Sequence, residues 1–155
     1  MALITSLVFL LMLTLLATSS MQNATLQEKV AGSLRWRDQS FQLAKSVLRA
    51  GEARLRSTGF DLPQCSSPVT CAPPQQALTL PLVESGAESG INWVGFEGGF
   101  YGIQFLGQTD EPAGPHGKRL QNLYRVTAVA VQGNSRTVLE SIHTQERRIM
   151  WRQRQ

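Results

Sequence analysis

The sequence predicts an α+β protein in which one long N-terminal helix packs on a C-terminal antiparallel β-sheet. Three observations carry this prediction. The first 17 residues, MALITSLVFLLMLTLLA, are apolar and uncharged, and apolar side chains then recur at helical spacing as far as Leu55. Short segments of strand-like composition follow, separated by turns rich in Gly, Pro, Asn and Ser. The length of 155 residues allows one ordinary globular domain and leaves no room for two with separate large cores.

Residues 1–24 are predicted to form a helix inserted in a membrane. Residues 1–17 cover roughly 25 Å as a helix, close to the hydrocarbon thickness of about 30 Å. No charged side chain occurs before Glu28. A cleaved secretory signal is the alternative, because an apolar stretch followed by small residues is typical of such peptides. The lack of Lys or Arg before the apolar stretch argues against it, since that charge normally sets the orientation.

Residues 25–58 are predicted to continue as an amphipathic helix. We expect its second half, Phe41 to Leu55, to pack on the sheet, and its first half, Leu26 to Leu34, to pack on neighbouring subunits. Seven basic residues on this helix raise nucleic acid or anionic lipid as partners, but without clustered aromatic residues or a known motif a solvated face is the better interpretation, and no nucleic acid is predicted. The charged side chains expected on the solvated side are Arg35, Arg37, Asp38, Lys45, Arg49, Glu52, Arg54 and Arg56.

Residues 59–76 are predicted to be a Cys/Pro-rich loop. Cys65 and Cys71 are the only cysteines, and Pro68 bends the short chain between them, so a small disulfide ring closes easily. A disulfide places this region in an oxidising compartment. Zinc is disfavoured because the only histidines, His116 and His143, fit no ligand spacing, and two free thiols are the remaining alternative.

Residues 77–155 are predicted to form the antiparallel sheet. Turns are expected at 97–99, 112–117 and 133–135. Neither face of the fourth strand is cleanly polar, and one of them should cover the helix. The closing RRIMWRQRQ could seat on an acidic partner, but a frayed, solvated tail is the preferred interpretation. The expected strands are Ala77–Leu82, Ile91–Val94, Tyr101–Leu106, Leu123–Val131 and Thr137–Thr144.

The stretch INWVGFEGGFYGIQF is the richest candidate for a partner surface. Its candidate anchors are Trp93, Phe96, Phe100 and Tyr101, with Phe105 nearby, and the alternative is that these aromatic residues belong to the core. Asp110, Glu111 and His116 lie together in TDEPAGPHG, but their spacing is not that of a calcium loop.

The sequence gives no support for catalysis. It contains no Gly-rich phosphate loop, nucleophile elbow, HExxH motif or Cys–His dyad, and neither histidine has an obvious carboxylate partner. We therefore predict no catalytic residue, no metal, no cofactor and no small-molecule substrate.

The phrase ATLQEKVAGSLRWRDQSFQLAKSVLRAGEARL, after the apolar helix, resembles the PilX family of minor type IV pilins. Members of that family typically read ATLQEKMAGN, then an acidic and arginine-rich turn, then a phrase similar to AFQAAEAALR.GE. The resemblance covers residues 1–56. A weaker resemblance links YRVTAVAVQGNSRTVLESIHTQERR to the closing strands of the family, whereas residues 59–119 match no family pattern.

The resemblance implies a pilin fold and pilin processing. Type IV prepilins carry a short basic leader that a prepilin peptidase removes before it methylates the new terminal amine, which here would be Met1. The leader would supply the orienting charge, so the rest of the chain would lie in the periplasm, anchored in the inner membrane before it enters the fibre. The residues expected to pack on other subunits in the membrane and fibre are Leu3, Ile4, Thr5, Leu7, Leu10, Leu11 and Leu13.

Thr5 stands where major pilins carry a Glu that pairs with the terminal amine of a neighbouring subunit. A subunit without that ion pair is poorly suited to repeated addition along a fibre, so the resemblance implies a priming or tip role. The implied partners are other minor pilins, the major pilin, inner membrane lipid and a PilY-type tip adhesin, and the implied outcomes are twitching motility and adhesion. Alternatively, Thr5 only bonds to its own helix backbone.

Two further functions stay open at this level. A type II secretion minor pseudopilin would share the helix and the tip role, and a soluble secreted binding domain would lack the helix after signal cleavage. The sequence also lacks the Pro that commonly breaks the major-pilin helix, and whether residues 17–20 melt in its place is open.

Overall fold

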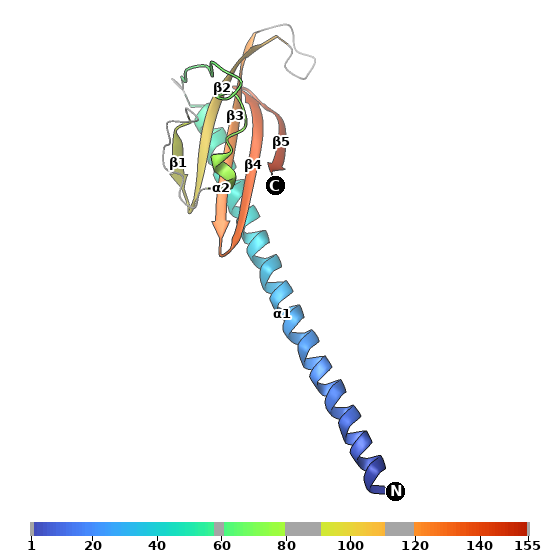
Figure 1. Ribbon diagram of the computed structural model, residues 1–155. Coiled ribbons are helices and arrows are strands. Elements are labelled where there is room, and N and C mark those ends of the chain that lie inside the picture. The colour runs from blue at the N-terminus through green and yellow to red at the C-terminus, as the bar shows by residue number, and fades with distance from the viewer. Residues whose placement is uncertain (1, 58–60, 80–90, 111–119, 155) are drawn as a thin grey trace. The chain divides into compact units, whose positions relative to one another are not determined.

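The computed structural model describes residues 2–57, 61–79, 91–110 and 120–154. The chain divides into two compact units, residues 1–36 and residues 37–155. Helix α1 (Ala2–Leu55) begins in the first unit and ends in the second, without interruption at residues 17–20 (Figure 1). The helix predicted to run to residue 58 therefore ends three residues earlier.

The first unit consists of the N-terminal part of α1 alone. Its apolar side chains are exposed, and α1 is the one described helix that is long and apolar enough to cross a membrane. The uncharged, leucine-rich sequence of residues 1–27 explains the helix, because leucine and alanine favour helical structure.

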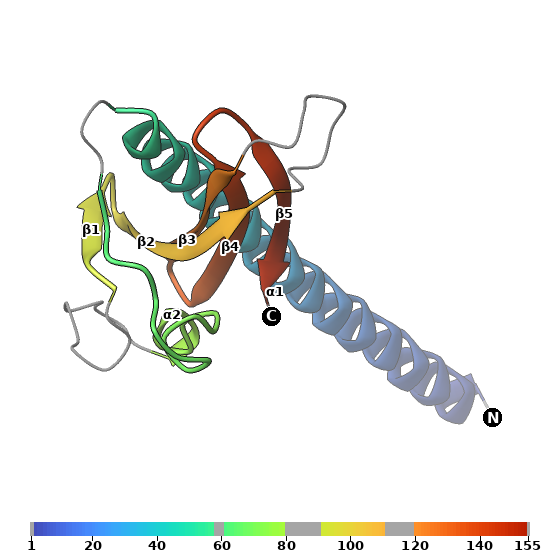
Figure 2. The ribbon, with the colours of Figure 1, turned by 90° about the horizontal axis from the view of Figure 1, so that it is seen from above.

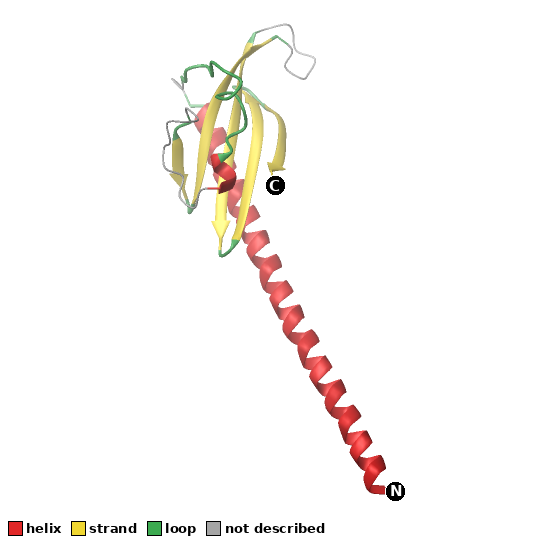
Figure 3. Ribbon diagram, viewed as in Figure 1, coloured by secondary structure: helices red, strands yellow, loops and turns green. Residues whose placement is uncertain are grey.

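The second unit contains a five-stranded antiparallel sheet, whose strands are yellow in Figure 3. The strands follow the order β1-β2-β3-β4-β5, as labelled in Figure 1. Sequential hairpins join β1 to β2 and β3 to β4, with turns at Gly98 and Gly133, both of which have positive φ. This agrees with the predicted α+β class and with two of the three predicted turns. The strands are β1 (Trp93–Phe96), β2 (Gly99–Thr109), β3 (Gln121–Gln132), β4 (Ser135–Thr144) and β5 (Arg148–Arg154).

Both faces of the sheet are covered, which explains why β3 has no polar face. On one face the end of α1 packs against the sheet, and α2 (Gln76–Thr79) lies on the opposite face (Figure 2). The first core contains Ala44, Val47, Leu48, Leu55, Tyr101, Ile103, Tyr124, Val126, Ala128, Ala130 and Leu139. The second core contains Ala77, Ile91, Trp93, Val129 and Val138. The predicted packing of Phe41 to Leu55 on the sheet is thus confirmed.

Gly51 allows the close approach of α1 to the sheet. A Cβ atom at this position would lie 2.6 Å from Val126 Cγ1 and 3.0 Å from Tyr101 Cδ2. Both neighbours are themselves buried in the first core, so they have little room to move.

Two expected strands and the expected tail need correction. The strand predicted over Ala77–Leu82 is wrong at its start, where the Pro73–Pro74 pair leads into the helical turn α2, because a short apolar segment does not by itself distinguish strand from helix. Residues 80–82 lie outside the described residues. The strand predicted over 91–94 is displaced to Trp93–Phe96. The closing arginine-rich segment is not a frayed tail: Arg148–Arg154 form β5, paired along β4.

Candidate functional site

The apolar segment of α1 presents the predicted subunit-packing residues to its surroundings. Leu3, Ile4, Leu7, Leu10, Leu11 and Leu13 are all exposed, with Leu10 at 66%. Thr5 Oγ1 donates a hydrogen bond to the Ala2 carbonyl oxygen at 2.8 Å, so its hydroxyl is satisfied by its own helix. An exposed stripe of this size is not stable in water alone, because each leucine favours an apolar environment. Met1, the expected methylation site, lies outside the described residues.

The predicted aromatic partner surface is only partly a surface. Trp93 and Tyr101 are buried, Phe100 packs against the second core and Phe105 against the first. Phe96 is 38% exposed. Trp93 and Tyr101 are therefore corrected from surface anchors to core residues, the alternative that the sequence left open. Their alternate positions along β1 and β2 place Trp93 and Phe100 on one face and Tyr101 on the other.

Cys65 and Cys71 form a disulfide, with their Cα atoms 5.2 Å apart, as predicted. The ring is attached to the edge of β2, because the Cys65 amide donates to the Phe105 carbonyl oxygen at 3.0 Å. The acidic loop with Glu111 and His116 lies outside the described residues.

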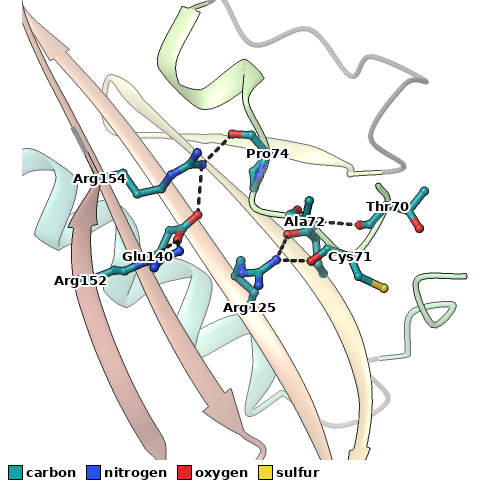
Figure 4. Close-up of polar contacts among 9 residues, drawn as sticks. Thr70, Cys71, Ala72, Pro74, Arg125, Glu140, Arg152 and Arg154 are labelled. Atoms are coloured by element: carbon teal, nitrogen blue, oxygen red, sulfur yellow. Dashed lines mark hydrogen bonds and ion pairs between the residues drawn. The ribbon is translucent and has the colours of Figure 1, made fainter. Parts of the chain in front are cut away.

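Side chains of the sheet hold the last part of the disulfide ring and the residue that follows it (Figure 4). Gln104 Nε2 donates to the carbonyl oxygens of Thr70 and Ala72, at 2.7 and 3.1 Å. Arg125 Nη1 donates to the Cys71 carbonyl oxygen at 2.6 Å and to Gln104 Oε1 at 3.2 Å. The loop backbone thus finds its hydrogen-bond partners in two side chains from neighbouring strands, and the disulfide restricts the same loop covalently.

Glu140 forms ion pairs with two arginines of β5 on this face of the sheet. Its side chain is 3% exposed and accepts from Arg152 at 3.0 Å and from Arg154 at 3.2 Å. Arg154 Nη1 also donates to the Pro74 carbonyl oxygen at 2.9 Å, so one guanidinium joins the last strand, the sheet and the loop. Burial lowers the pKa of Arg125; the Glu140 carboxylate opposes this effect, whereas Arg152 and Arg154 add to it.

On the opposite face, Glu52 of α1 meets the sheet. Its carboxylate Oε1 lies 3.1 Å from His143 Nε2 of β4 and 3.3 Å from Arg148 Nη1 of β5. Two expectations are corrected here: Glu52 is 4% exposed and not solvated, and His143 has a carboxylate partner. Helical spacing misplaced Glu52 because the residue lies at the border of the apolar stripe, and the sequence holds no signal that pairs it with residues in distant strands.

The lowered pKa of Glu52 makes the stability of the domain depend on pH. Burial alone would raise its pKa, but His143, Ser141 and Arg148 together outweigh burial, and the pKa of Glu52 lies below its ordinary value of 4.5. A carboxyl group with a lowered pKa in the folded state stabilises that state above its ordinary pKa, and this contribution disappears as the pH falls through the lowered value.

The free energy of unfolding of the unchanged chain should therefore fall as the pH is lowered from about 7 to about 3. We expect this fall to be smaller in the Glu52→Gln variant, as measured by urea unfolding at each pH. Asp38→Asn is the matched control, because it removes an exposed carboxylate from the same helix. Identical pH dependence of Glu52→Gln and the unchanged chain would contradict this account of the pair.

Among the described residues, no three His, Cys, Asp or Glu side chains cluster in a way that could hold a metal ion.

An apolar, uncharged helix continued in sequence by a helix-on-sheet domain is the arrangement of a pilin-like protein. Residues 1–49 match the family model described as PilX N-terminal. This match supports recognition of the chain as a PilX family minor pilin, and it does not extend to the sheet. Comparisons with curated proteins and with solved structures found no significant match.

The family match supports a pilin-like role in pilus assembly and association with other pilus components. The PilX family is structural rather than enzymatic, and the apolar helix fits a membrane-anchored component of the pilus.

Proposed function

We propose that this chain is a minor pilin of a priming or tip complex for type IV pilus assembly. The observation that carries the proposal is the match of residues 1–49 to the PilX N-terminal model, which includes the uncharged apolar segment of α1 with its exposed leucines. Before assembly, inner membrane lipid covers the helix and the folded domain lies in the periplasm. In the fibre, the other minor pilins and the major pilin replace the lipid.

In this mechanism, packing between the apolar helices drives association of the subunits, and the folded domain determines which partners are bound. In lipid, helices associate through van der Waals contacts and interhelical hydrogen bonds, because the tails are as apolar as leucine. The subunit-packing residues Leu3, Ile4, Leu7, Leu10, Leu11 and Leu13 form the proposed contact. Outside the membrane, shape and charge distinguish one partner from another.

Thr5 supports placement at the tip. Its hydroxyl donates to Ala2 of the same helix, and residues 1–27 contain no carboxylate to pair with the terminal amine of another subunit. Repeated addition along the fibre is therefore not favoured by an intramembrane ion pair. At the tip, the complex presents a PilY-type adhesin and in this way supports adhesion and twitching motility.

Processing at Met1 follows from the same proposal: the terminal amine is methylated after the leader has been removed. The test is incorporation into the fibre, which a charge placed in the apolar helix at Leu10 is expected to block.

A further inference from the structure

The last strand, β5, lies at an edge of the sheet and its outer side is open among the described residues. It pairs with β4 on one side only, in the order β1-β2-β3-β4-β5. An edge strand presents unpaired backbone N–H and C=O groups that can accept a further strand. With seven residues, β5 is as long as a typical strand, so an added strand of ordinary length could pair along all of it.

Both faces of β5 offer an apolar side chain beside a guanidinium group. Met150 pairs with Ile142 and Arg152 with Glu140, so these two residues of β5 lie on the face away from α1. Trp151 pairs with Ser141, and Arg148 pairs with His143 after the bulge and contacts Glu52, so these two lie on the α1 face. Met150 and Trp151 are 49% and 50% exposed, although both are large and apolar.

The charge of this edge is positive and only partly balanced. Residues 147–154 contain four arginines and no acidic residue. Arg148 and Arg152 pair inward with buried carboxylates, yet their side chains remain 45% and 53% exposed, and a guanidinium has five N–H donors. Arg147 is exposed and forms no ion pair with another described residue.

We propose that the outer edge of β5 binds an extended acidic segment of a partner protein by strand addition. The backbone of β5 supplies the hydrogen bonds, and acidic side chains on the added strand meet Arg148 and Arg152 on the two faces, with apolar side chains against Met150 and Trp151. A second copy of this chain is a poor occupant, because pairing two copies of β5 brings two arginine-rich strands together. This inference goes beyond the proposed function, since it requires only the folded domain.

The test uses the full chain in non-ionic detergent and two fluorescent peptides of about eight residues, long enough to cover a strand of ordinary length. One peptide alternates glutamate with valine and threonine, and the other has lysine in place of glutamate. We expect the acidic peptide to bind, at least about tenfold more tightly than the basic peptide, by fluorescence anisotropy. Hydrogen exchange of the complex should show new protection of amides in Arg148–Arg154, and none in β1 at the opposite edge.

Two exposed substitutions locate the site. Arg147→Glu together with Trp151→Ser should weaken acidic-peptide binding by at least about tenfold. Arg49→Glu, which introduces the same charge change at an exposed position of α1, should leave binding unchanged. Circular dichroism of each variant confirms that its sheet is intact.

Several results would overturn the proposal: no binding of the acidic peptide, equal binding of the basic one, or protection outside β5. Self-association that the Trp151→Ser variant abolishes in sedimentation would assign the edge to a second copy instead. Failure of the chain to enter pili would not affect these results, so the two proposals are tested separately.

Discussion

A Leu10→Arg variant is expected to be absent from pili while the protein is still made. Leu10 lies within the uncharged segment of residues 1–27 and is exposed, so lipid or another subunit must cover it. A charged side chain at the centre of a membrane helix costs about 3 kcal/mol on insertion scales, and it also faces the apolar helices of the fibre. Both effects act against the same step, the passage of the helix from the membrane into the fibre.

The measurement compares sheared pili with the membrane fraction by immunoblot in a strain that expresses only the variant. We expect at least a tenfold loss from the pilus fraction, which corresponds to about 1.4 kcal/mol and is smaller than the estimated cost. Gln42→Arg is the control, because it adds the same charge at an exposed position of α1 in the second unit. Normal incorporation of Leu10→Arg would show that helix packing does not drive assembly.

The second large effect is expected at Glu140. A Glu140→Gln substitution keeps the size of the side chain but removes its charge and replaces one acceptor oxygen by an NH2 donor, so Arg152 and Arg154 lose their buried carboxylate. Arg125, whose pKa burial already lowers, also loses the Glu140 charge that stabilises its cation. The Arg154 pair is the buried one, with side chains 12% and 3% exposed, and removal of one partner from a buried ion pair typically costs about 3 kcal/mol.

Urea unfolding of the full chain in non-ionic detergent, followed by tryptophan fluorescence, measures this loss. Glu146→Gln is the control, because Glu146 is exposed next to β5 and its substitution should change the free energy of unfolding by less than about 0.5 kcal/mol. The Glu140→Gln variant should also expose the loop around Cys71, which proteolysis between Cys65 and Pro74 would report. An unchanged free energy of unfolding would mean that Glu140 does not hold β5 and the loop together.

The helix and most of the strands could be predicted because their signals are local. The apolar spacing of Phe41 to Leu55 and the alternation in Leu123–Val131 are properties of neighbouring residues, and both predicted elements are present. Strand ends were less predictable, as the shift of the first strand to Trp93–Phe96 shows, since pairing with β2 decides where β1 begins.

The polar contacts could not be predicted because their partners are distant in the sequence. Arg148 and Glu52 are 96 residues apart, and Arg125 and Cys71 are 54 apart. Arginines at the end of a chain are usually solvated, so only the fold reveals that Arg152 and Arg154 have a buried carboxylate opposite them. The same pairing converts the expected tail into an edge strand.

The central claim is that this chain enters a membrane and then a fibre as a processed pilin. Mass spectrometry of the N-terminal peptide, in protein purified from its native envelope, tests this claim most directly. The account predicts a mature terminus at Met1 with a methylated amine. A terminus beginning after residues 17–20 would contradict it, because a cleaved secretory signal would leave a soluble domain without the apolar helix.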